Sequence, residues 1–312
     1  MRLFLVRHGE TVDNVAQVYA GSRDSELTNH GFQQANRLGR YLYATGHRFS
    51  HIFSSHLQRA FRTAELILEA QAAAVSTDEK PLQVRRLPIL MEQDFGFYEG
   101  KKWYQKPPGG DKSGKQAHRD EKVSTPSFVD METKDSMAER MDAFLDEHLI
   151  PLLDDRSLVD ERSVAIVSHG IILSVLWRRL LARLPPKSVS PSVRVLETYR
   201  SFQLENLGGW SNTGYLELLL QKQANSPPQT KVKGDSSTGP EMGLVKTDEP
   251  VEELSPKVAT ARILHEWTAV IETVNGKNHL QGLKRTGAGV GSAKYDAGQK
   301  TLDTFFKRRR IS

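Results

Sequence analysis

The chain contains no cysteine among its 312 residues. A chain without cysteine forms no disulfide bonds, builds no zinc site from thiolates and uses no cysteine nucleophile, and this composition suits a reducing compartment. The sequence also lacks any apolar run near the roughly 18 residues that a transmembrane helix needs, and no signal peptide is visible because Arg7 interrupts the apolar stretch after Met1. We therefore expect an intracellular protein, nuclear or cytoplasmic, with no membrane partner.

An excess of positive charge is absent from most of the chain. The whole sequence has a formal net charge of +5, but residues 1–221 hold 28 basic and 28 acidic residues, whereas residues 222–312 hold 15 and 10. A neutral body with a basic end favours an acidic partner for that end rather than a basic enzyme surface.

The composition changes beyond Gln221 to runs rich in Ser, Pro, Gly and Lys, which bury too little apolar area to fold. We predict a catalytic domain over residues 1–221, a disordered linker over 222–256, an amphipathic helix over 257–276 and a basic flexible tail over 277–312. The helix is inferred from apolar residues at helical spacing, namely Ile263, Trp267, Val270, Ile271 and Val274. We expect it to pack back on the domain, with partner binding as the alternative.

Four short aliphatic stretches predict strands, and each ends in a polar cluster. The pairs are residues 3–6 with Arg7-His8-Gly9, 51–55 with Arg59 in the segment that follows, 87–90 with Glu92, and 164–167 with Ser168-His169-Gly170. Open α/β sheets place their ligands at the carboxyl ends of their strands. We therefore expect these polar side chains to meet at one rim.

Helical patterns alternate with these strands. They cover residues 28–45, with Thr28 as the capping residue, a segment after Ser55, residues 136–153 and residues 171–184. Aliphatic strands that alternate with helices indicate an α/β fold of three layers, with a mostly parallel central sheet flanked by helices.

Four ordered motifs carry a resemblance to a known family. They are Arg7-His8-Gly9-Glu10-Thr11 with Asn14, Ser54-Ser55-x-Leu57-x-Arg59-Ala60, Glu92-x-x-x-Gly96-x-x-Glu99-Gly100, and Ser168-His169-Gly170. In residues and in order, the chain from Met1 to about Gln221 resembles the histidine phosphatase superfamily, also called phosphoglycerate-mutase-like. The resemblance implies a phosphoglycerate-mutase-like fold and a small phosphorylated substrate.

The resemblance also implies that catalysis proceeds through a phosphohistidine. His8 is then the nucleophile, since a neutral imidazole, with an ordinary pKa of about 6.5, is competent near neutral pH. Arg7 and Arg59 hold the phosphoryl oxygens through charged hydrogen bonds, and Asn14 and His169 complete the cradle. On this reading the reaction requires no metal and no other cofactor.

The leaving oxygen needs a proton, and the resemblance assigns this role to Glu92 as general acid and then as general base toward water. Burial beside Phe95 or Phe97 would hold its carboxyl group protonated. Asp94 and Glu99 are rival carboxylates, for which the alternative is a structural role.

Residues 101–134 interrupt the alternation of strands and helices. The stretch is rich in Lys, Pro and Gly and follows the proposed acid directly, so it is a candidate lid that selects the substrate. Lys101, Lys102 and Trp103 are placed to contact an anionic group beyond the scissile phosphate. The alternative is a solvated loop.

A second specific pattern lies at residues 299–306. Gln299, Leu302, Phe305 and Phe306 resemble the PCNA-interacting box, the peptide that binds the sliding clamp. One helical turn would present the aliphatic and aromatic side chains as an apolar plug. The basic run 307–310 would add attraction to an acidic clamp surface or to DNA, or would serve as a nuclear localisation signal.

Three functions are compatible with these patterns. We favour a metal-independent phosphomonoesterase recruited to the sliding clamp by its C-terminal region. A phosphoglycerate-mutase-type isomerase would share every core residue, and a clamp-binding scaffold with minor catalysis is the third alternative.

Overall fold

The computed structural model describes residues 1–72, 81–103, 123–155, 163–199, 202–223, 262–287 and 289–296. Most of the predicted linker, residues 104–122 of the predicted lid and the clamp-binding motif at 299–306 lie outside these ranges. In the described part of the chain, no helix is long and apolar enough to cross a membrane.

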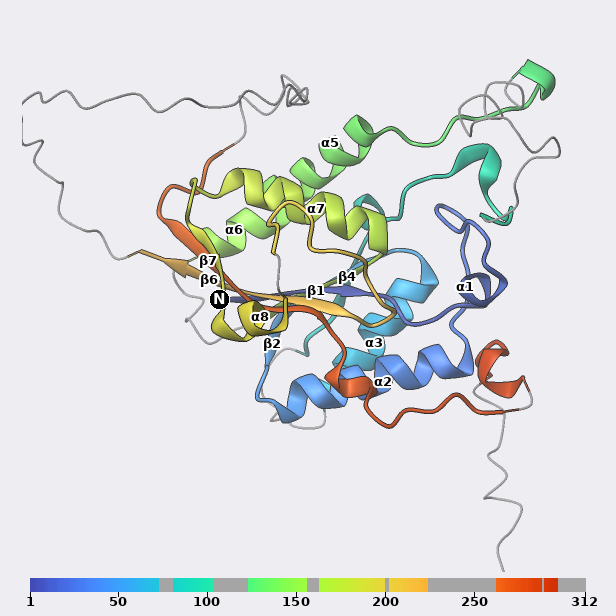
Figure 1. Ribbon diagram of the computed structural model, residues 1–312, viewed down its shortest axis with the longest axis horizontal. Helices are drawn as coiled ribbons and strands as arrows, with labels where there is room; N and C mark the ends of the chain where they lie inside the picture. The colour runs from blue at the N-terminus through green and yellow to red at the C-terminus, as the bar shows by residue number, and fades with distance from the viewer. Residues whose placement is uncertain are drawn as a thin grey trace, which may run out of the picture.

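A seven-stranded sheet forms the centre of the molecule, in the order β3-β2-β4-β1-β6-β7-β5 (Figure 1). Its strands are β1 (Arg2–Arg7), β2 (Phe49–Ser55), β3 (Val84–Leu87), β4 (Ser163–Ser168), β5 (Val189–Pro191), β6 (Tyr215–Lys222) and β7 (Trp267–Gly276). The strands β3, β2, β4 and β1 are parallel, β6 is antiparallel to β1, and β7 is antiparallel to β6 but parallel to β5. The mostly parallel sheet predicted from the sequence is confirmed.

Helices cover both faces of this sheet (Figure 1). Helices α2 (Asn29–Ala44) and α3 (Gln58–Ala72) lie on one face, whereas α5 (Lys134–Phe144), the π-helical turn η3 (Leu145–Leu149), α6 (Ile150–Asp154) and α7 (Gly170–Arg183) lie on the other. Two further short helices are α1 (Val12–Ala16), which follows β1, and α8 (Val193–Thr198), which follows β5. The predicted helices at 28–45, after Ser55, at 136–153 and at 171–184 are confirmed, and the Thr28 side chain caps α2 as expected.

The side chains of β1 alternate between the two hydrophobic cores, one on each face of the sheet. Phe4 and Val6 are buried in the cluster that contains α2 and α3, whereas Leu3 and Leu5 are buried with residues of α5 and α7. Successive side chains of a strand point to opposite faces, so one short strand contributes to both cores. The central position of β1 fixes the strand end from which Arg7 and His8 emerge.

The predicted amphipathic helix over 257–276 is wrong, because residues 267–276 form strand β7. Ala269 and Ile271 are fully buried and alternate with partly exposed residues, as in a strand that pairs with β6. The β-branched residues Thr268, Val270 and Thr273 favour a strand, and tertiary pairing with β6 decides the outcome.

The predicted domain boundary at Gln221 and the flexible tail from residue 277 also need correction. Beyond β7, the chain returns across α2, where the ring of Tyr295 stacks on Phe32 with centroids 3.7 Å apart. On the way it forms the short turns η5 (Asn278–Leu280) and η6 (Val290–Ser292). Arg285 pairs with Glu10 in the motif of the first strand. The folded unit therefore extends at least to Asp296.

Candidate active site

The pairing of β1 with β4 places two histidines side by side. Arg7 is in register with Ser168, so the next residue of each strand, His8 and His169, follows at the same sheet edge. The amide of His8 donates to the carbonyl of Ser168 at 3.0 Å, and the two imidazole centroids are 5.1 Å apart. The strand-end clusters predicted from the sequence therefore meet at one rim.

The surroundings of His8 fix its tautomer. Its Nδ1 lies 2.7 Å from the carbonyl oxygen of Gly9, which accepts a hydrogen bond, so the proton is on Nδ1 and Nε2 keeps its lone pair. Burial, followed by the charges of Arg59 and Arg7, lowers the pKa of His8 well below its ordinary value. The imidazole is therefore neutral at pH 7, as a nucleophile requires.

Gly9 is required where the backbone turns after His8. A Cβ atom at this position would lie 2.6 Å from the carbonyl oxygen of Gly31. The amide of Gly9 donates to Thr63 Oγ1 at 3.0 Å, which ties the turn to α3. The turn at Gly9 is thus held by α2, through Gly31, and by α3, through Thr63.

Arg59 orients the second histidine. Its Nε donates to His169 Nδ1 at 3.1 Å, so a neutral His169 carries its proton on Nε2, which is buried and has no partner among the described residues. Burial, followed by Arg59 and His8, lowers the pKa of His169 well below its ordinary value. His169 is fully buried beside His8 and does not itself line the cavity described below.

The two terminal nitrogens of Arg59 hold the loop over residues 20–23. They bond to the carbonyl oxygens of Ala20, Gly21 and Arg23 at 2.8 to 3.0 Å. Burial lowers the pKa of Arg59 despite the neighbouring carboxylates, of which Glu92 contributes most. Arg59 therefore positions the site as well as supplying its charge.

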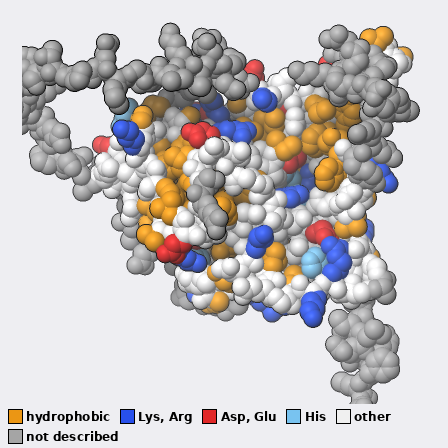
Figure 2. All heavy atoms as spheres, viewed as in Figure 1, with side chains coloured by type: hydrophobic (Ala, Val, Ile, Leu, Met, Phe, Trp, Pro, Cys, Tyr) orange, Lys and Arg blue, Asp and Glu red, His pale blue; other side chains and the backbone are white. Residues whose placement is uncertain are grey.

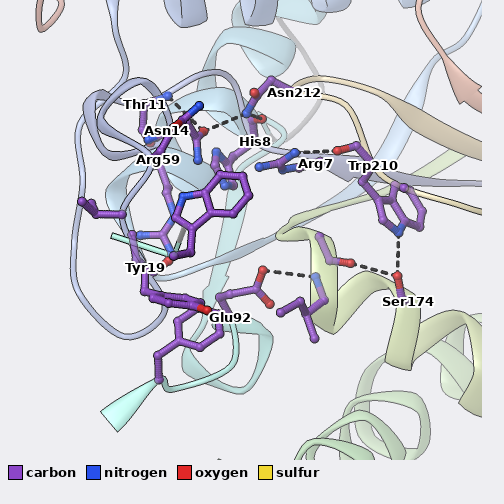
Figure 3. A pocket seen from close by; sticks show the side chains of 18 of the residues that line it. Arg7, His8, Thr11, Asn14, Tyr19, Arg59, Glu92, Ser174, Trp210 and Asn212 are labelled. Atoms are coloured by element: carbon purple, nitrogen blue, oxygen red, sulfur yellow. Dashed lines mark hydrogen bonds between the residues drawn. The ribbon is translucent and has the colours of Figure 1, made fainter. Parts of the chain in front are cut away.

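Arg7 and Asn14 meet two residues that were not predicted from the sequence (Figure 3). Arg7 Nη1 donates to the carbonyl oxygen of Trp210 at 2.5 Å. Asn14 Oδ1 accepts from Asn212 Nδ2 at 3.0 Å and from the amide of Thr11 at 3.2 Å. Because the oxygen of Asn14 takes both contacts, its amide nitrogen is the atom left for a ligand. Asn212 and Trp210 lie in a loop that does not follow a predicted strand, so the pattern of polar residues at predicted strand ends does not include them.

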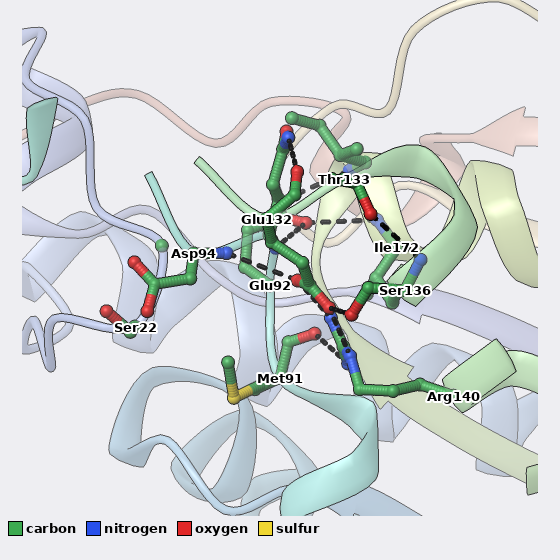
Figure 4. Close-up of polar contacts among 12 residues, drawn as sticks. Ser22, Met91, Glu92, Asp94, Glu132, Thr133, Ser136, Arg140 and Ile172 are labelled. Carbon is green, nitrogen blue, oxygen red and sulfur yellow. Dashed lines mark hydrogen bonds and ion pairs between the residues drawn. The ribbon is translucent and has the colours of Figure 1, made fainter. Parts of the chain in front are cut away.

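Glu92 lies at the amino end of α7, where its side chain is 8% exposed (Figure 4). Its Oε1 accepts from the amides of Gln93 and Ile172, and its Oε2 accepts from the amide of Ile171, at 3.0 to 3.1 Å. Glu92 is therefore buried, as expected, and backbone N–H groups at a helix terminus take its oxygens.

A polar network from α5 supports the segment before Glu92 (Figure 4). Arg140 donates to the carbonyl oxygens of Ile89 and Met91 at 2.7 and 3.1 Å, and it binds both oxygens of Glu132. Burial tends to raise the pKa of Glu132, but the hydrogen bonds from Arg140 and Ser136 outweigh it and lower that pKa. A charged pair thus holds the backbone that presents Glu92.

The two rival carboxylates have structural contacts. Glu99 accepts from the amides of Gly21, Ser22 and Phe95 at 2.9 to 3.1 Å, so it closes the loop that Arg59 also holds. Asp94 accepts from the amide of Gly96 at 2.7 Å. Neither lines the cavity.

A cavity of about 800 Å³ brings these groups together. Its lining includes five of the six residues predicted for catalysis and phosphate binding, namely Arg7, His8, Asn14, Arg59 and Glu92, with His169 behind them. On the face shown in Figure 2, hydrophobic, basic and acidic side chains meet between α7 and α1. Of the three lid residues, Trp103 lines the cavity, whereas the Lys101 ammonium group lies 2.8 Å from the centroid of the Phe97 ring.

Comparison with known proteins agrees with this geometry. Residues 3–201 match the model of the histidine phosphatase superfamily (branch 1). The chain belongs to this superfamily. Within the described ranges, no group of three or more His, Asp or Glu side chains could hold a metal ion.

Relatives of this member of the superfamily carry two kinds of name. The chain is 26% identical to a probable phosphatase of Schizosaccharomyces pombe over 306 residues, which cover 96% of this chain and 78% of that protein. It is 33% identical over 183 residues to the probable phosphoglycerate mutase GpmB of Erwinia tasmaniensis, covering 58% and 75%. Among solved structures, the mycobacterial glucosyl-3-phosphoglycerate phosphatase is similar at 24% identity and a TM-score of 0.49, over 70% of this chain and 92% of that one.

The C-terminal segment supports the site through His279. This buried histidine bonds to Thr213 Oγ1 at 2.8 Å, and Thr213 adjoins Asn212, which holds Asn14. Burial, followed by the charge of Arg37, lowers the pKa of His279 to about 4. A residue from the predicted tail is thus part of the support for the end of the cavity that Asn14 lines.

We expect His279 to make stability depend on pH. Its pKa in the unfolded chain is about 6.5, so as the pH falls from 6.5 to 4 the unfolded chain binds a proton that the native protein does not, and stability decreases. Between pH 7 and pH 4, the free energy of unfolding in urea should fall by about 3 kcal/mol more in the wild type than in His279→Gln. The exposed His265→Gln serves as control, and equal losses in all three proteins would contradict the assignment.

Proposed function

We propose that the protein is a metal-independent phosphomonoesterase that acts through a phosphohistidine. Nε2 of His8 attacks phosphorus, the bond from phosphorus to the ester oxygen breaks, and Glu92, which takes up a proton from water when the substrate dianion is bound, gives this proton to that oxygen. Water then attacks the phosphohistidine, Glu92 takes a proton from the water, and the N–P bond breaks to release phosphate.

One observation carries this proposal: the nucleophilic nitrogen is fixed. The hydrogen bond from His8 Nδ1 to Gly9 leaves the Nε2 lone pair in a cavity lined by the guanidinium groups of Arg7 and Arg59. We assign the unpartnered Nε2–H of His169 and the amide nitrogen of Asn14 as further donors to the phosphoryl oxygens. Positioning and charge stabilisation of this kind supply most of the catalysis in phosphoryl transfer.

Replacing the nucleophile should abolish turnover. We expect His8→Ala to lower kcat/KM for phenyl phosphate, assayed in the presence of a chelator, by at least about 1000-fold. Brief reaction of the wild type with a labelled phosphomonoester, followed by mass spectrometry, should find the phosphoryl group on His8. His265→Ala, at an exposed histidine remote in the sequence, should behave as wild type. Unchanged hydrolysis in His8→Ala would favour the scaffold alternative.

Glu92 should matter most when the leaving group is poor. A general acid contributes about 10²- to 10⁴-fold, so Glu92→Gln should lower kcat/KM, which reports formation of the phosphohistidine, strongly for an alkyl phosphate and far less for 4-nitrophenyl phosphate, whose leaving group needs little protonation. Asp94→Asn should show no such dependence on the leaving group. The same contrast in Asp94→Asn, together with its absence in Glu92→Gln, would transfer the role to Asp94.

The mutase alternative rests on the relative named as a probable phosphoglycerate mutase. A mutase must return the phosphoryl group to its product, whereas the proposed enzyme transfers it to water. Isomerisation of a monophosphoglycerate that depends on a bisphosphate primer, and exceeds release of inorganic phosphate, would promote this alternative.

We propose further that residues 299–306 recruit the enzyme to the sliding clamp. The support is the sequence pattern, together with the position of Tyr295, which stacks on Phe32 of the domain and precedes Gln299 by four positions. A partner that binds this motif would therefore be held next to the enzyme.

Clamp binding should depend on the paired aromatic residues. The full chain should bind purified PCNA with micromolar or better affinity, and Phe305→Ala with Phe306→Ala should abolish binding, since buried aromatic anchors dominate such contacts. Neutralising Arg308 and Arg309 with glutamine is the matched control and should weaken binding only modestly. If the charge variant loses binding and the aromatic variant does not, the attraction is electrostatic and the motif is not used.

A further inference from the structure

Helix α7 extends the cavity away from the nucleophile along one face. Gly170, Ser174 and Arg178 are four residues apart, which places them above one another on a helix, and all three line the cavity. The first lies next to His169 at the phosphate end. The last is exposed, at the other end of the same wall.

An indole forms the middle of this wall (Figure 3). Trp210 Nε1 donates to Ser174 Oγ at 2.8 Å, and Ser174 Oγ donates to the carbonyl oxygen of Gly170 at 3.0 Å. The carbonyl oxygen of Trp210 also accepts from Arg7. The ring is therefore fixed between the phosphate end and Arg178, where it offers an apolar surface to the body of a substrate.

Aromatic side chains also line the part of the cavity formed by residues 17–20. Tyr19 lies on the other side of the cavity from Trp210 in Figure 3. Trp103 is 57% exposed, and its amide bonds to the carbonyl oxygen of Gln17. A cavity lined by aromatic groups between two cationic ends fits a ligand with a ring in its middle.

Arg178 differs from the other arginines of α7. Arg179 and Arg183 bind Asp142 through their guanidinium groups. No hydrogen bond or ion pair of the Arg178 side chain is found within the described ranges, although this side chain borders the same cavity as His8. An unpaired cation at the mouth of a phosphate site is suited to a second anionic group of the ligand.

Helix geometry sets the distance between the two anion sites. Arg178 is nine residues beyond His169, about 13 Å along the helix axis, and its side chain leans back toward the amino end, which leaves on the order of 10 Å between the anionic groups. A three-carbon phosphate with an adjacent carboxylate is too short to span this distance.

We propose that the substrate is a phosphomonoester whose ring-shaped body lies against Trp210 and whose far end carries a second anionic group bound by Arg178. A carboxylate and a phosphate share the required chemistry. This inference rests on the proposed function, because the phosphate end of the ligand is placed at His8.

A matched substrate series tests it. Phenyl phosphates with a para chain that ends in a carboxylate, a phosphonate or a neutral amide differ only at the far end. Wild-type kcat/KM should be about 10- to 100-fold higher for the anionic substrates than for the amide. Arg178→Gln should lose this preference, Arg178→Lys should keep part of it, and the exposed Arg40→Gln should keep all of it. The better of the two anionic substrates identifies the anion.

The outcomes separate this inference from the proposed function. If hydrolysis of the whole series requires His8 but the wild type shows no preference for an anionic end, the second subsite is disproved and the phosphatase stands. If Arg178→Gln weakens the amide and the anionic substrates equally, Arg178 does not recognise the second anion. Hydrolysis that does not depend on His8 disproves the proposed function itself.

Discussion

The parallel pairing of β1 with β4 is the constraint on which the site depends. A register with Arg7 opposite Ser168 leaves no freedom in where His8 and His169 emerge, so two imidazoles are buried 5.1 Å apart. Two buried rings beside two guanidinium groups cannot both be charged at modest cost, and the pKa values of both histidines are lowered accordingly, mainly by burial. The sheet register thus determines a chemical property, the neutral state of the His8 imidazole.

The second layer of the site is a chain of hydrogen bonds that begins at Glu99. Glu99 binds the amides of the loop over residues 20–23, the carbonyl oxygens of that loop bind Arg59, and Arg59 binds His169. Each group has its partners inside the protein, so the geometry exists before any ligand arrives. This explains why a carboxylate in the same motif as Glu92 has no place in the cavity.

The strand-end motifs could be predicted from the sequence because their geometry is local. Arg7, His8 and His169 follow aliphatic strands directly, and α/β sheets gather such positions at one edge. Asn212 and Trp210 could not be predicted in this way, since they reach the cavity from a loop whose position depends on β6 and α7. Strand β7 was missed because apolar residues at 267, 270, 271 and 274 fit a helical period. Its β-branched residues were the available signal, and its pairing with β6 spans a long sequence separation.

Charge balance relates the site to the ligand that we propose for it. With Glu92 ionised before the substrate binds, Arg7, Arg59 and Glu92 leave one net positive charge around two neutral rings, and each arginine interacts electrostatically with Glu92. A phosphate dianion would reverse the sign of this local charge, which removes the electrostatic part of the histidine pKa depression while the burial part stays. Because burial is the larger cause for both rings, we expect His8, the proposed nucleophile, to keep its lone pair when the dianion binds. The same low-dielectric surroundings that keep His8 neutral would also strengthen the attraction of Arg7 and Arg59 for the phosphate group that we propose His8 attacks.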